Sequence, residues 1–168
     1  MAKLLRRIQH KPNWDPQGEF STYLPPGQAP ADSLDDIATD ANRLSIWQID
    51  DEGTNLDRVL AAMASPRENL QKLDYLIFDI QDVQVLEIPV EASPGNTLDQ
   101  EANKSWHFHL THLSAAALAS LANRMLARGP ARRQNERQLI ALLDKSVANG
   151  WIDQSRLSPS IRSKLSPP

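Results

Sequence analysis

The 168-residue chain has no cysteine, only 6 glycines and no apolar run long enough to cross a bilayer. Without cysteine there is no disulfide framework and no thiolate chemistry, which fits a reducing compartment. The few glycines leave little room for a nucleotide-binding loop, and we find no Gly-x-x-x-x-Gly-Lys-Ser/Thr, Gly-x-Gly-x-x-Gly or Gly-x-Ser-x-Gly pattern. The basic N-terminal residues lack the apolar centre of a signal peptide. We therefore expect a soluble, cytoplasmic protein with no cofactor and no membrane association.

The hydrophobic pattern predicts a single α+β domain, or a small α/β one, in which a short mixed sheet is covered by about four helices. Strands are predicted over 43–49, 75–80 and 83–90, with 105–111 as a further candidate. The main helices are predicted over 55–64, 66–73, 114–128 and 132–148. If the strands at 44–49 and 75–80 are parallel, the β-α-β crossover between them should be right-handed.

Composition divides the chain into three segments. Residues 1–31 are expected to form a short helix at 2–9 followed by a Pro-rich arm, residues 32–152 the globular α+β domain, and residues 153–168 a flexible tail containing serine and proline. The arm holds five of the twelve prolines and should be extended. Its aromatic residues either anchor it on the core or form a recognition segment for a partner. These aromatic residues are Trp14, Phe20 and Tyr23.

The net charge of −3 is unevenly distributed along the chain. Residues 1–31 carry +2, residues 32–101 carry −12 with sixteen acids, and residues 102–168 carry +7 with ten bases. Three interpretations follow: the acidic and basic parts face each other in the fold, the basic part binds an acidic partner, or both are solvated surfaces.

Three of the four histidines lie in one stretch, Trp-His-Phe-His-Leu-Thr-His, at residues 106–112. Alternation predicts a strand with His107 and His109 on one face, whereas spacings of four and three predict a helix with His109 and His112 as neighbours. Either pair could bind a metal, act as general acid or base, or form the polar face of a packed segment. No spacing matches a known zinc motif, so we assign no metal site and keep His107 and His109 as a candidate polar site.

A second candidate for metal chemistry consists of acidic side chains near the predicted strand at 75–80. Asp79, Asp82 and Glu87 could imitate the carboxylates of a metal-dependent nuclease. This stretch lacks the lysine of such sites, and its negative charge would repel nucleic acid. We interpret these acids as residues that end strands and form turns.

Basic residues cluster where the last two predicted helices meet, and we take Arg128, Arg132, Arg133 and Arg137 as a candidate partner-binding surface. Nucleic acid is disfavoured because no aromatic residues interleave the arginines and the pI of the chain is about 5.8. We assign no catalytic residue. The leading hypothesis is a bacterial-type interaction or regulatory protein without enzymatic activity, which binds a protein partner through the arm, the basic C-terminal helix, or both. The alternative is a metal- or histidine-dependent hydrolase centred on His107 and His109.

Overall fold

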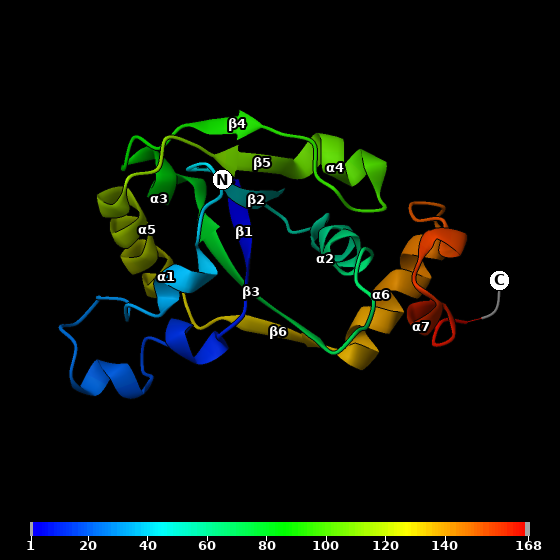
Figure 1. Cartoon of the computed structure of the whole chain (residues 1–168), viewed down its shortest axis with the longest axis horizontal. Helices are drawn as coiled ribbons and strands as arrows, with labels where there is room; N and C mark the ends of the chain where they lie inside the picture. Colours follow the sequence, from blue (N-terminus) through cyan, green and yellow to red (C-terminus); the bar gives the residue numbers. More distant parts are fainter. Residues whose placement is uncertain (1, 167–168) are drawn as a thin grey trace.

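Six strands form one sheet in the order β4-β5-β2-β1-β3-β6, and every ladder between neighbours is antiparallel (Figure 1). The computed structural model describes residues 2–166. The strands are β1 Lys3–Ile8, β2 Leu44–Ile49, β3 Lys72–Asp79, β4 Val90–Ala92, β5 His107–Leu110 and β6 Arg132–Asn135. The predicted α+β class is confirmed, although the sheet is larger than expected and antiparallel rather than mixed.

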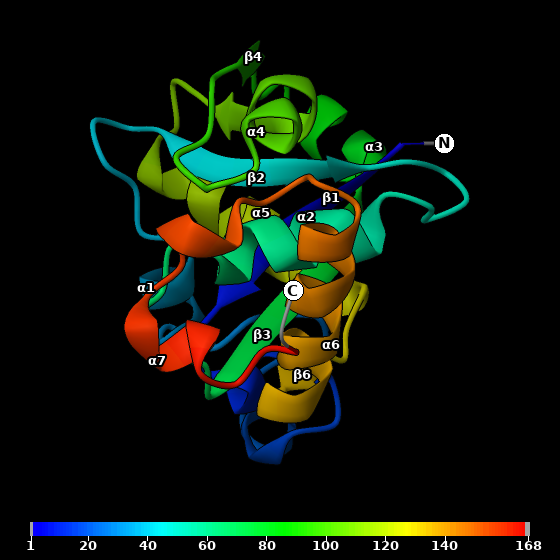
Figure 2. The same ribbon diagram turned by 90° about the vertical axis from the view of Figure 1, so that its right-hand side faces the viewer.

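Helices pack on both faces of this sheet (Figures 1 and 2). One face carries α2 and α6 with the C-terminal α7, and the opposite face carries α1, α3 and α5. We call these the α2 face and the α5 face. The α-helices are α1 Ser33–Asp36, α2 Leu56–Ala64, α3 Ile80–Gln84, α4 Gln100–Trp106, α5 Ala115–Ala127, α6 Glu136–Ala148 and α7 Pro159–Arg162. Short 3₁₀ turns are η1 Lys11–Trp14, η2 Glu19–Thr22 and η3 Gln154–Arg156.

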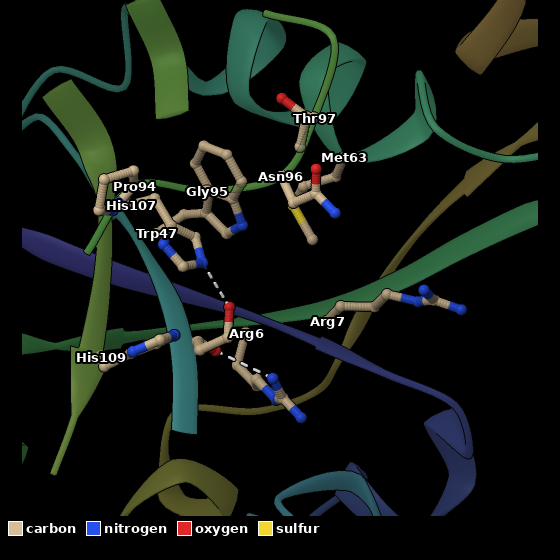
Figure 3. A pocket seen from close by; sticks show the side chains of 11 residues that line it. Arg6, Arg7, Trp47, Met63, Pro94, Gly95, Asn96, Thr97, His107 and His109 are labelled. Carbon is tan, nitrogen blue, oxygen red and sulfur yellow. Dashed lines mark hydrogen bonds between the residues drawn. The ribbon is translucent and has the colours of Figure 1, made fainter. Parts of the chain in front are cut away.

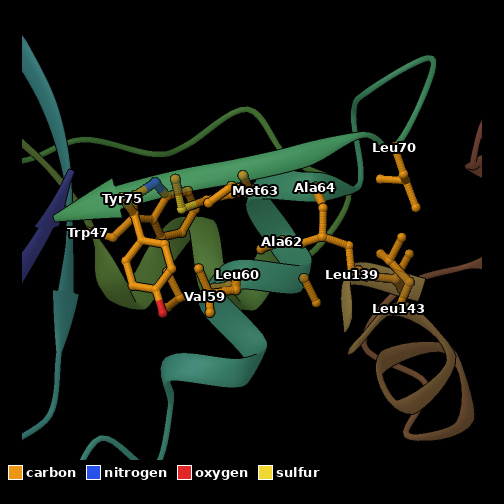
Figure 4. Close-up of a cluster of buried hydrophobic side chains, with 14 of the residues drawn as sticks. Trp47, Val59, Leu60, Ala62, Met63, Ala64, Leu70, Tyr75, Leu139 and Leu143 are labelled. Atoms are coloured by element: carbon orange, nitrogen blue, oxygen red, sulfur yellow. The ribbon is translucent and has the colours of Figure 1, made fainter. Parts of the chain in front are cut away.

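The core has two halves because successive strand residues point to opposite faces. On β2, Trp47 and Ile49 join the hydrophobic cluster of the α2 face, and Leu44 and Ile46 join that of the α5 face. Figure 4 shows the first cluster, in which Val59 and Leu60 of α2 lie beside Trp47 of the sheet. Each fully buried aliphatic side chain contributes roughly 1.5–3 kcal/mol of transfer free energy.

The predicted helix at residues 2–9 is wrong: this segment is β1, which lies between β2 and β3. Leu4 and Ile8, four residues apart, fit a helical stripe. In the strand they face the α5 side together, while Leu5 faces the α2 side. A central strand is buried on both faces and so shows no simple alternation of apolar and polar residues. Its spacing therefore predicts a helix although the segment is a strand.

Three further element predictions need correction. The predicted helix at 66–73 is a turn followed by β3. The β-branched stretch at 83–90 begins in α3, because the Asp82 side chain accepts a hydrogen bond from the Asp79 amide and starts a helix there. Residues 132–135 form β6, and α6 begins only after Asn135. The Asn135 side chain accepts from the Gln138 amide, and the Asn135 amide donates to the Gln138 side chain.

Other predicted elements are confirmed at nearly the expected positions. They are β2, α2, β3 and α5, and β5 corresponds to the candidate strand at 105–111. β2 and β3 run parallel to each other, because β1 lies between them and pairs antiparallel with both, so the segment that contains α2 is a crossover between two parallel strands that are not adjacent.

Both terminal segments pack on the core. Trp14 of the arm is buried, and its indole Nε1 donates to Asp36 Oδ2 at 2.8 Å. Tyr23 remains 70% exposed. The segment predicted as a flexible tail contains α7, and Leu157, Ile161 and Leu165 belong to the α2-face cluster. The tail therefore contributes to the core, because its three apolar residues are buried in the same cluster as residues of α2 and α6. The domain boundaries themselves stay a prediction.

We expect Ile161→Ala to destabilise the protein by about 2–4 kcal/mol, since it removes fully buried methyl groups from the α2-face cluster. The exposed neighbouring Ser163→Ala is the matched control and should change the free energy of unfolding by less than about 0.5 kcal/mol. Urea unfolding followed by circular dichroism measures both. Equal stability of the two variants would show that the tail does not pack as described.

Candidate functional site

A cavity of about 410 Å³ opens on the α2 face, where Met63 of α2 contributes to its lining. Its walls come from β1, β2 and β5 and from the loop before α4 (Figure 3). The lining residues are Arg6, Arg7, Ser45, Trp47, Met63, Pro94, Gly95, Asn96, Thr97, His107 and His109.

The cavity lies where β1 and β2 stop pairing. Their ladder ends at the pair Leu5 and Trp47, although β1 continues to Ile8 and β2 begins at Leu44. The carbonyl of Ser45 accepts a hydrogen bond from Arg6 Nη1 at 2.9 Å instead of one from the β1 backbone. The side chain of Arg6 thus satisfies a backbone group that the separation of the strands would leave unpaired.

His107 connects two segments through both of its ring nitrogens. Nδ1 lies 2.6 Å from the carbonyl oxygen of Ser93, and Nε2 lies 2.5 Å from Ser45 Oγ. A carbonyl can only accept, so Nδ1 carries the proton and donates to Ser93. Nε2 of the neutral ring is then an acceptor, and the Ser45 hydroxyl donates to it. Figure 3 shows the bond between Ser45 and His107 as a dashed line.

Burial lowers the pKa of His107 from its ordinary value of 6.5. The hydrogen bond to the Ser93 carbonyl opposes this shift and the nearby His109 adds to it. Desolvation disfavours the charged form of an imidazole, so His107 is neutral near pH 7. The ring therefore presents an unprotonated Nε2 to the serine hydroxyl.

The cavity is electrostatically positive although the chain is acidic overall. Its lining, taken from the described residues, contains Arg6 and Arg7 but no aspartate or glutamate. Burial lowers the pKa of Arg6 to about 10, so its guanidinium is still protonated at neutral pH. His109 is half-buried beside His107, with the ring centroids 5.3 Å apart in an edge-on arrangement. An anionic group would be favoured here over a cationic one.

The structure settles how the predicted histidine pair is arranged. Residues 107–110 are a strand, so His107 and His109 lie on the same face, as the alternating pattern indicated. Both nitrogens of His107 are engaged in hydrogen bonds, which leaves no lone pair for a metal ion. Between residues 2 and 166, no group of three or more His, Asp or Glu side chains is placed to hold one.

Two of the four predicted partner-binding arginines form internal ion pairs. Arg128 binds Asp82 through Nε and Nη2 and also contacts Asp79 at 2.9 Å. Arg133 binds both carboxylate oxygens of Asp74, at 2.7 and 2.9 Å. These contacts join the basic C-terminal part to the acidic middle of the chain, which is the first of the three charge arrangements considered above.

The remaining two predicted arginines, Arg132 and Arg137, are exposed and make no ion pair within the described part of the chain. A partner-binding role for the four arginines stays a prediction. The acids considered for nuclease chemistry do not converge: Asp79 and Asp82 pair with Arg128, while Glu87 lies in a turn with a φ of 53°.

Sequence reasoning did not single out Ser45 or Ser93. Ser45 lies on the same face of β2 as Trp47 and Ile49, so a small polar residue at an inward position was the available signal. Ser93 contributes its backbone, and no residue pattern marks a carbonyl that faces a histidine 14 residues later.

Comparison with known proteins gives no significant match, whether to family models, to curated proteins or to solved structures. None of the helices within residues 2–166 is long and apolar enough to cross a membrane. A functional assignment must therefore come from the site itself.

The lowered pKa of His107 predicts how stability depends on pH. Below about pH 6.5 the unfolded chain protonates this imidazole while the folded protein does not, so the folded state binds fewer protons. Stability from this group is present above pH 6.5 and is lost as pH falls toward the folded pKa. Asp50, Asp74 and Asp153 have lowered pKa values and titrate below about 3.8, outside this window.

We expect the urea midpoint of the wild-type protein to fall between pH 7 and pH 5, and this slope to be smaller in His107→Gln. His10→Gln removes an exposed histidine and is the matched control. The account fails if His107→Gln keeps the full wild-type slope.

Proposed function

We propose that the protein is a serine hydrolase that cleaves ester or amide bonds, with Ser45 as nucleophile and His107 as general base. The observation that carries this proposal is the hydrogen-bond chain from Ser45 Oγ to His107 Nε2 and from His107 Nδ1 to the Ser93 carbonyl, at the wall of an open cavity. An activated nucleophile needs an adjacent base, and the base needs a third group that orients it.

Acylation begins when Ser45 Oγ attacks the substrate carbonyl carbon and His107 Nε2 takes the hydroxyl proton. The imidazolium that forms then donates this proton to the leaving alcohol or amine as the tetrahedral intermediate collapses. The products of this half-reaction are the free leaving group and an acyl ester on Ser45. His107 returns to the neutral form in which it started.

Deacylation repeats the same proton transfers with water. His107 Nε2 removes a proton from water, hydroxide attacks the acyl carbon, and the imidazolium returns the proton to Ser45 Oγ. The Ser93 carbonyl keeps Nδ1 protonated throughout, so Nε2 remains the atom that exchanges protons. A backbone carbonyl is neutral, and it stabilises the imidazolium less than a carboxylate would.

The negative charge on the oxygen of the tetrahedral intermediate must be stabilised by hydrogen-bond donors that have no other acceptor. Asn96 and Arg7 line the same cavity, and neither side chain makes a hydrogen bond within the described residues. The Asn96 amide can donate to an oxyanion formed at Ser45, while Arg7 adds positive charge at the edge of the cavity. Arg6 is a positioning residue, because its guanidinium holds the backbone of Ser45 through the carbonyl.

The interaction function predicted from the sequence is supported less well by the geometry. Arg128, Arg133 and the buried Trp14 are engaged within the fold, which leaves Tyr23 and the two exposed arginines for a partner. Of the two forms of the alternative hypothesis, the arrangement of His107 supports the histidine-dependent hydrolase over the metal-dependent one.

A fluorophosphonate probe tests the nucleophile without knowledge of the substrate. Ser45 Oγ should attack phosphorus and displace fluoride while His107 takes the hydroxyl proton, which leaves a stable phosphonate ester on Ser45. Peptide mass spectrometry should locate this adduct on Ser45 of the native protein. His107→Gln should label at least about 100-fold more slowly than the wild type, because general base catalysis accelerates a reaction about 10²–10⁴-fold.

His10→Gln and Ser105→Ala are matched controls, since both residues are exposed, and they should label at the wild-type rate. Heat-denatured protein should not label at Ser45. Absence of a Ser45 adduct in the native protein, or equal labelling in His107→Gln, contradicts the proposed function.

A further inference from the structure

A second cavity of about 460 Å³ lies beside the first, and Arg7 lines both of them. It extends along the α2 face from the end of β1 to the start of β3. Its lining residues are Arg7, Ile8, Gln9, Arg67, Glu68, Asn69, Gln71, Lys72 and Asp74. Because Arg7 lines both, the two cavities are neighbours, and we refer to them together as the groove.

Arg67 in this second cavity has unused hydrogen-bonding capacity. Its Nη1 donates to the carbonyl of Lys72 at 2.7 Å, while its Nε is buried and has no hydrogen-bond partner among residues 2–166. A buried donor without an acceptor carries the full cost of its desolvation. Nη2 also makes no hydrogen bond among residues 2–166, and it is the donor of this guanidinium that is open to an acceptor in the cavity.

Positive charge accumulates around the same guanidinium. Burial lowers the pKa of Arg67, and the nearby Arg7 lowers it further, with Asp74 opposing both. Arg7 is exposed and makes no ion pair within the described chain. The two guanidinium groups therefore repel each other, and no ion pair joins either of them to a carboxylate among residues 2–166, although Asp74 offsets part of the charge of Arg67.

The acids of the cavity do not neutralise this pair. Asp74 is buried and accepts both hydrogen bonds of Arg133, and Lys72 lies 3.7 Å from it. Glu68 is exposed and forms no ion pair within residues 2–166. The carboxylate of Asp74 therefore pairs with Arg133 and Lys72, and it forms no ion pair with Arg67 among residues 2–166.

We propose that Arg7 and Arg67 form a binding subsite for an oxyanion, a carboxylate or phosphate group, in the cavity next to Ser45. Arginine presents a planar set of donors that matches either group. The consequence for substrate choice rests on the proposed function: the hydrolase acts on esters or amides that carry an anionic group a short distance from the scissile bond.

Binding can be tested separately from catalysis by titrating inorganic phosphate and succinate, at constant ionic strength, into isotopically labelled protein. We expect saturable changes in the amide NMR signals of Arg7, Arg67 and Lys72. The apparent dissociation constant should rise at least about tenfold in Arg67→Gln and in Arg7→Gln, because each loses charge-assisted hydrogen bonds. Arg7 is exposed, so its variant should fold even if Arg67→Gln is unstable.

Arg137→Gln is the matched control, because it removes an exposed arginine outside the groove and should leave the dissociation constant unchanged. A stronger response to phosphate or to succinate identifies the preferred anion. The subsite is refuted if neither anion saturates these signals, or if Arg7→Gln and Arg67→Gln bind as the wild type does.

The link to catalysis is tested with two esters that share one leaving group, 4-nitrophenyl benzoate and the 4-nitrophenyl monoester of terephthalic acid. The carboxylate of a succinic monoester would expel 4-nitrophenolate by itself, whereas the carboxylate of the terephthalic monoester cannot reach its own ester. We expect kcat/KM to be about tenfold higher for the anionic ester, and Arg67→Gln to lose this preference while it hydrolyses the neutral ester normally. No preference in the wild type would overturn the assignment of an anionic substrate. If Ser45→Ala hydrolysed both esters as fast as the wild type, the proposed function would fail, and the phosphate titration would still decide the subsite.

Discussion

The hydrogen bond from His107 Nδ1 to the Ser93 carbonyl is the interaction on which the functional account depends. It fixes the tautomer of the imidazole, because the carbonyl oxygen cannot donate. Burial keeps the ring neutral, and Nε2 then faces the hydroxyl of Ser45 as an acceptor. With the proton on Nε2 instead, the same two side chains would still touch, but His107 could not accept a proton from the serine.

This arrangement depends on an incomplete ladder of backbone hydrogen bonds between β1 and β2. β1 and β2 separate beyond Leu5 and Trp47, and Arg6 satisfies the Ser45 carbonyl that this separation exposes. The positive charge of the groove has a related origin. Acids of the middle segment are paired with the C-terminal arginines and lysines, through Asp82 with Arg128, Asp74 with Arg133 and Asp57 with Lys145. Among residues 2–166 the arginines of the groove form no ion pair, although Asp36 and Asp74 lie close enough to offset part of the charge of Arg6 and Arg67, so an acidic chain presents a cationic cavity.

The sequence could predict elements whose signals are local. Ser114 caps α5 as expected, and the alternating residues of β2 and β5 form strands. It could not predict β1, because a strand buried on both faces shares its spacing with a helical stripe. It also could not predict the packing of residues 157–165, whose three apolar side chains depend on helices far away in the sequence. The sequence singled out His107 and His109 but not the partners of His107. Ser45 carried only a weak signal, a small polar residue at an inward strand position, and the Ser93 carbonyl has no sequence signature.

Nitrogen-15 NMR of the His107 imidazole tests the central claim most directly, because the chemical shifts of the two ring nitrogens report which one carries the proton. The account predicts a neutral ring at pH 7 that is protonated at Nδ1 and unprotonated at Nε2, and that persists below pH 6.5. A ring protonated at Nε2, or an imidazolium at pH 7, would contradict it.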